Sequence, residues 1–199
     1  MDFIDYAANA KGWLEVIKID TNGDEEIVFS DKNVICSGMG ATMSNMYAAT
    51  GLNVSSYQLN MIQLGTCGTD ALQVSTNGLM GSALGAGHYG TSKFQDIKSG
   101  TTVYNNNLKA TNQAFLVIPQ SYVDKIGDRT VRWTILIDNE TANGESLQEI
   151  GLYANNPLEK SPLQTFLCAY RHFGDTSHGN DGIRKNNRFS LLFRWTIEF

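Results

Sequence analysis

The sequence predicts a mainly antiparallel β-sandwich with one short helix and long loops. The first observation is the run over residues 189–199, in which every odd position is large and apolar and most even positions are polar. Because side chains alternate between the two faces of a strand, this run is typical of a strand with one buried face. The second observation is the turn signal Asn22-Gly23 between two β-rich runs. The third is that only one segment, near residues 39–49, carries apolar residues at helical spacing.

The length of the chain indicates how many domains it has, and its charge indicates which partners it binds. The chain has 199 residues, 42% of them hydrophobic, and a net charge of −5. We expect a single β-sandwich domain over residues 13–199, preceded by an N-terminal arm over residues 1–12. An acidic chain with no run of Lys or Arg longer than two is not expected to bind nucleic acid. We also expect no secretory signal and no membrane-spanning segment.

The arm carries three apolar side chains ahead of the first predicted strand, namely Phe3, Ile4 and Tyr6. Apolar surface left in water is unfavourable by about 25 cal/mol per Å². We therefore predict that these three residues are assembly contacts on a neighbouring subunit. The alternative is that the arm folds back onto its own domain.

Residues 13–19 and 25–29 are predicted to pair as a hairpin, with both central residues of the turn at positive φ. Acidic and amide residues alternate over residues 20–24, as they do in calcium-binding loops. The EF-hand pattern also needs Gly at its sixth position and Glu at its twelfth, where Glu25 and Asp31 stand here. The segment is therefore interpreted as a turn.

The helix near residues 39–49 carries an apolar stripe at helical spacing, formed by Met39, Met43 and Met46 or Tyr47. Its methionines are predicted to fill the core, and a groove for a partner is the alternative. A short strand follows at residues 60–65, and then a loop-rich insertion around residues 69–112. That insertion contains Gly85–Gly90, which matches the letters of the dinucleotide-binding motif. The motif works only between a strand and a helix, and neither is predicted there, so no cofactor is expected.

The second half of the chain contains five further predicted strands, at residues 113–118, 131–137, 148–153, 163–170 and 189–199. Gly151 lies in the middle of one of them and suggests a bulge or a close approach of two backbones. The residues predicted to anchor the core are Trp133, Leu152, Phe193, Trp195 and Ile197.

Titratable side chains form no catalytic or metal-binding pattern in the sequence. No two of His88, His172 and His178 lie three or four residues apart, and none neighbours a Cys at zinc spacing. No G-x-S-x-G motif is present, so the sequence does not predict an enzyme. Cys36, Cys67 and Cys168 are far apart, and we expect free, buried or half-buried thiols. One disulfide with one leftover thiol is the alternative.

A series of short motifs occurs in a recognisable order along the chain. These are Asn33–Ile35, Met61–Gly68, Val131–Ile137, Glu149–Tyr153, Lys185 and Leu192–Phe199. The series resembles that of small tail, collar and fibre proteins of tailed bacteriophages. The resemblance covers about residues 30–199 in order, although residues 69–112 match poorly.

This resemblance implies a virion component, made in the host cytoplasm, that forms a homo-oligomer, often a trimer, and binds other virion structural proteins. The resemblance assigns no catalytic residues to this chain. A tail, baseplate, collar or fibre protein is the first hypothesis, and a head-decoration or head-fibre protein is the second. A carbohydrate- or receptor-binding module for a host-surface glycan is the third, with loop aromatics Tyr89, Tyr104 and Tyr122 as candidate platforms. A hydrolase is the fourth.

Overall fold

The computed structural model describes residues 10–48, 57–65, 93–95, 102–104, 116–154, 166–174 and 182–199. Nine strands form one antiparallel sheet. They are β1 (Lys11–Asp20), β2 (Glu25–Ile35), β3 (Leu59–Gly65), β6 (Leu116–Val117), β7 (Val123–Lys125), β8 (Thr130–Ile137), β10 (Glu149–Ala154), β11 (Phe166–His172) and β13 (Phe189–Glu198). Two small sheets pair β4 (Lys93–Gln95) with β5 (Thr102–Tyr104), and β9 (Ser146–Leu147) with β12 (Ile183–Arg184).

Helix α1 (Ser37–Ala48) is the one α-helix in the described ranges, so an all-β fold with one short helix is confirmed. The helix begins two residues before the predicted start near residue 39. A 3₁₀ turn at Gln120–Tyr122 joins the regions of β6 and β7.

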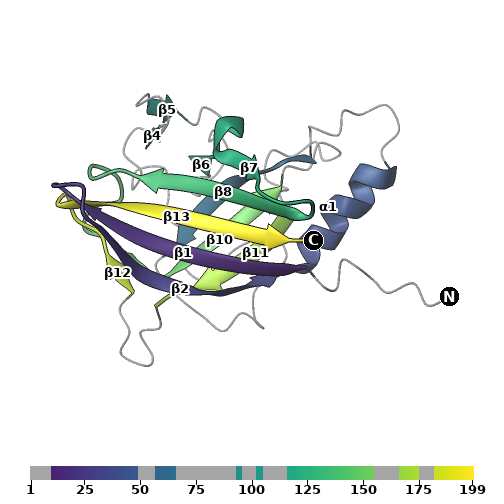
Figure 1. Cartoon of the computed structure of the whole chain (residues 1–199), viewed down its shortest axis with the longest axis horizontal. Helices are drawn as coiled ribbons and strands as arrows, with labels where there is room; N and C mark the ends of the chain where they lie inside the picture. Colours follow the sequence, from purple (N-terminus) through teal and green to yellow (C-terminus); the bar gives the residue numbers. More distant parts are fainter. Residues whose placement is uncertain are drawn as a thin grey trace.

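One curled sheet supplies both layers of the fold. The strand order is β6-β3-β10-β11-β2-β1-β13-β8-β7. Strand β2 forms the corner, because its residues 25–33 pair with β1 whereas Val34 and Ile35 pair with β11. Figure 1 shows β1, β13 and β8 crossing over β10 and β11. The apolar core lies between these two halves of the same sheet.

The last long strand is central to this core. Strand β13 pairs with β1 on one side and with β8 on the other. Its odd-numbered side chains, from Phe189 to Ile197, are at most 8% exposed and belong to the main core. All five predicted anchor residues are buried there, namely Trp133, Leu152, Phe193, Trp195 and Ile197. Leu192 is also buried, on the opposite face, in a row with Ile17 and Leu136 of the adjacent strands.

The first hairpin lies where it was predicted, but its turn is of another type. Gly23 has a φ of +91°, whereas the one described non-glycine residue at positive φ is Ala142. Asn22 therefore does not adopt the second positive φ that was predicted. The Asp20 side chain accepts hydrogen bonds from the backbone N–H groups of Asn22 and Asp24, at 2.8 and 3.0 Å. These bonds stabilise a longer loop, in which one glycine at positive φ is sufficient.

The predicted arm is shorter than expected. Strand β1 begins at Lys11, which pairs with Glu198, so residues 11 and 12 belong to the sheet. Ala10 packs against the main core. The predicted contacts Phe3, Ile4 and Tyr6 lie outside the described residues, as do Cys67, His88, His178 and the glycine motif at Gly85–Gly90.

Bulges occur close to Gly151, although not at that residue. The pairing of β10 with β11 skips Cys168, and its pairing with β3 skips Asn60. The extra residue thus lies in the neighbouring strand in both cases. Bulges increase the local twist of a sheet, which fits their position in this strongly curled part of the fold.

Candidate functional site: an apolar pocket beside helix α1

Helix α1 is seated on β11 at one end of the curled sheet, near the C-terminus of the chain (Figure 1). The backbone N–H of Cys36, just before the helix, donates to the carbonyl oxygen of Cys168 at 2.9 Å. A side chain at Gly38 would overlap the backbone of Leu167, so a glycine is what allows the helix to approach this closely. The Thr42 hydroxyl donates to the Gly38 carbonyl at 2.8 Å and lies 3.4 Å from the Cys168 sulfur.

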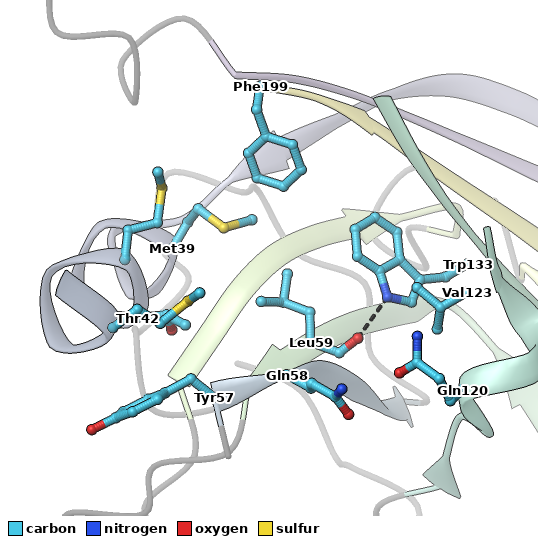
Figure 2. Close-up of a pocket in the computed structure, with 11 residues that line it drawn as sticks. Met39, Thr42, Tyr57, Gln58, Leu59, Gln120, Val123, Trp133 and Phe199 are labelled. Atoms are coloured by element: carbon cyan, nitrogen blue, oxygen red, sulfur yellow. Dashed lines mark hydrogen bonds between the residues drawn. The ribbon is translucent and has the colours of Figure 1, made fainter. Parts of the chain in front are cut away.

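An apolar pocket of about 500 Å³ lies between α1 and the facing ends of the sheet. Figure 2 shows how helix α1, the start of β3, the 3₁₀ turn, β7, β8 and the last residue of the chain surround it. The lining residues are Met39, Thr42, Met43, Met46, Tyr57, Gln58, Leu59, Gln120, Val123, Trp133 and Phe199. Apart from α1 and Phe199, they come from the start of β3 near one end of the strand order and from the 3₁₀ turn, β7 and β8 at the other end, so the curl brings them together.

The polar side chains that line this pocket are few and neutral. The Trp133 indole N–H donates to the carbonyl oxygen of Leu59 at 2.6 Å, which links β8 to β3 across the gap (Figure 2). None of the described residues that line the pocket is Asp, Glu, His, Lys, Arg or Cys. The side chains of the pocket therefore suit an apolar group and include no carboxylate or imidazole for proton transfer.

Two thiols lie near α1, outside the pocket lining. Cys36 and Cys168 are both free, which confirms the expectation for these two residues. Burial raises the pKa of the Cys36 thiol to about 12, and the nearby Cys168 adds to the shift. Burial also raises the pKa of Cys168 to about 11, against the opposing effect of its hydrogen bond with Thr42. Both thiols are thus held in the unreactive protonated form.

We expect Cys36 and Cys168 to resist alkylation by iodoacetamide at about pH 8 in the folded protein, because the thiolate is the nucleophile. Peptide mass spectrometry before and after denaturation measures the modification of each cysteine separately. Both residues should react only after unfolding. Rapid modification of Cys168 in the native protein would contradict the close seating of α1 on β11.

Lys185, which belongs to the motif series, is also buried, but it does not line the pocket beside α1. Its ammonium group donates to the side-chain oxygen of Asn143 at 3.2 Å and to the carbonyl oxygen of Asn186 at 2.8 Å. Burial lowers the pKa of Lys185 to about 8, and the charge of Asp138 opposes that shift. Backbone hydrogen bonds also join this residue to Gly144 and Glu145. Lys185 therefore fastens two loops together.

The other sequence-based candidates do not gather into a site within the described part of the chain. Tyr122 is 1% exposed, so its ring is not available to a sugar. Tyr104 lies in β5, and Tyr89 lies outside the described residues. Among the residues that the structure describes, no group of three or more His, Cys, Asp or Glu side chains could hold a metal ion. No helix in the described part of the chain is long and apolar enough to cross a membrane.

The sequence predicted the methionine stripe as core filling, which holds only in part. Met39 is buried in the core as expected but also lines the pocket, together with the half-buried Met43 and Met46. Tyr47 is 86% exposed and does not line it. Phe199 carried only the signal of an apolar strand position, and Tyr57 and Gln120 carried none, because all three join the methionines only after the sheet has curled. Comparison with protein-family profiles, with curated proteins and with solved structures finds no match for this chain.

Proposed function

We propose that the chain is a structural component of a tailed-bacteriophage virion, in the tail, baseplate, collar or fibre. It acts by oligomeric assembly with copies of itself, with a trimer favoured, and with other virion proteins. The ordered motif series supports this proposal, as does the all-β fold. The observation that carries it is the apolar pocket beside α1, whose described lining is neutral and suits an apolar side chain of another protein segment.

A second exposed apolar surface supports the same kind of function. Ile27 of β2 is 62% exposed, and Val28, Val34 and Trp13 on the same two strands are also exposed. Single exposed apolar residues are ordinary, but several on one hairpin favour a protein contact. The protein thus has more than one surface for neighbours in a particle.

The location of the protein in purified phage particles tests the function directly. We expect the protein to remain with intact particles after gradient purification and to fractionate with tails when particles are disrupted. Light scattering of the isolated protein should give a homo-oligomer. Recovery with heads would favour the head-decoration hypothesis instead, and absence from particles would refute the proposal.

Deletion of residues 2–9 tests the arm as an assembly contact. The deletion stops before Ala10, which packs against the core, so the domain should keep its thermal unfolding midpoint. The shortened protein is expected to become monomeric in light scattering and to fail to enter particles. A shortened protein that forms the same oligomer and enters particles normally would show that the arm is not an assembly element.

A further inference from the structure

We propose that the pocket beside α1 is the receptor for the N-terminal arm, residues 2–9, of a neighbouring copy of this chain. The inference rests on the proposed assembly function and identifies the two surfaces that meet. Apolar side chains of one arm occupy the methionine-lined pocket of the next copy, and the arms are exchanged around the oligomer.

The point at which the arm leaves the fold supports this pairing. Lys11, the first residue of β1, pairs with Glu198 of β13. Phe199, which follows Glu198, lines the pocket. The arm therefore begins beside the rim of a pocket. Phe3 precedes Ala10 by seven residues, which reach at most about 25 Å when extended. The arm is long enough to enter a pocket close to its origin and too short to search far from it.

The chemistry of the two partners also matches. The arm offers Phe3, Ile4 and Tyr6, and the pocket offers three methionines, which adapt their shape and make favourable contacts with aromatic rings. Gln58 and Gln120 provide amides that can bond to the backbone or to the phenol of the entering segment.

Charge at this end of the sheet favours the same occupant. The arm carries Asp2 and Asp5 but no Lys or Arg before Lys11. A second hollow, of about 430 Å³, opens at the start of β1, and its charged lining residues are Lys11, Lys32 and Glu198, which leaves one positive charge in excess. Acidic arm residues that pass these lysines have opposite charges beside them, which helps to orient an arriving arm.

Exchange between copies requires a neighbour whose pocket lies within the same reach of about 25 Å. An arm that can reach a pocket beside its own origin can make the same contacts with an identical pocket on a neighbour. Exchange then loses no contact and adds the interface between the two copies. At the high local concentration of an assembling particle, the exchanged form is favoured.

Disulfide trapping between two differently tagged chains tests the exchange. One chain carries Ile4→Cys and the other carries Met46→Cys, both with Cys67→Ser to remove a native thiol outside the described residues. After co-expression and mild oxidation, we expect a disulfide that joins the two tags. In a matched control, Ile27→Cys replaces Met46→Cys, because Ile27 is 62% exposed and does not line the pocket. The control pair should not cross-link.

Three results would overturn the inference. One is the absence of any disulfide between the arm and pocket cysteines. Another is equally strong cross-linking of the control pair. The third comes from a single chain that carries both Ile4→Cys and Met46→Cys. Tagged and untagged copies of this double-cysteine chain are mixed before oxidation. If only disulfides within one chain form, the arm occupies its own pocket and no exchange occurs.

A pocket-filling variant provides a second measurement that leaves the arm unchanged. Met46→Trp places a larger side chain in the pocket and should weaken self-association by about tenfold or more, which equals 1.4 kcal/mol or more. Sedimentation across a concentration series measures this change, and an unchanged unfolding midpoint shows that the domain is intact. An intact domain with unaltered self-association would contradict the proposal.

The inference and the proposed function can fail separately. A cross-link between copies in a protein that is absent from purified particles would support arm exchange and refute the virion assignment. A protein that is present in particles but forms no cross-link between copies would support the virion assignment and refute arm exchange.

Discussion

Replacing Trp195 with alanine is expected to lower the free energy of unfolding by about 3–5 kcal/mol. The side chain is fully buried in the middle of β13, between Leu14 of β1 and Trp133 of β8. Removing it loses the burial of a large aromatic surface and leaves a cavity that surrounding strands can fill only in part. Urea unfolding monitored by circular dichroism measures the change.

Two further tryptophan variants make the test specific. Trp13 is 40% exposed and donates its indole N–H to the Ser30 hydroxyl. Trp13→Ala should therefore lower the free energy of unfolding much less than Trp195→Ala does. The indole N–H of Trp195 is buried and has no hydrogen-bond partner among the residues that the structure describes. Trp195→Phe removes that polar group while keeping most of the apolar volume, so it should cost less than the alanine variant.

An unchanged unfolding midpoint for Trp195→Ala would mean that the face assignment of β13 is inverted. The aromatic face would then be a subunit contact, and its loss would lower self-association instead of stability. Because all odd residues of β13 share one face, Phe193→Ala would have to behave in the same way. Measurement of both variants thus separates a core from an interface.

The sequence was sufficient to predict the elements whose pattern is long and local. The alternation over residues 189–199 identified β13 and its buried face, because a period of two persists over the whole strand. The Asn22-Gly23 signal located the first hairpin, although the turn type was wrong. The methionine spacing located α1 to within two residues of its start.

The curl of the sheet and the pocket had no such local signal. Strands β9 and β12 have two residues each, which is too short to show any periodicity. The corner depends on β2 changing its partner from β1 to β11 at Val34. Register between distant strands is set by the packing of the whole core. The pocket therefore could not be predicted, since its lining comes from segments that meet only after the sheet curls.

The seating of α1 yields a prediction that compares two glycines of one helix. Gly38→Ala is expected to lower the free energy of unfolding by about 1–3 kcal/mol, because its new methyl group overlaps the backbone of Leu167. Backbone atoms of a paired strand cannot move aside as a side chain can. Gly40→Ala has open space around the new methyl group, so it should instead stabilise the protein by about 0.5–1 kcal/mol.

The two variants should also differ at a residue that neither of them changes. If Gly38→Ala lifts α1 from β11, the contact between Thr42 and the Cys168 sulfur is lost and that thiol becomes accessible. Alkylation of Cys168 under native conditions should therefore rise in Gly38→Ala and remain low in Gly40→Ala. The same displacement moves Met43 and Met46 away from Phe199 and widens the pocket, so Gly38→Ala should also weaken self-association if the arm binds there. Equal stabilisation by both alanines, with Cys168 protected in each, would show that the helix is not held against β11 as the structure places it.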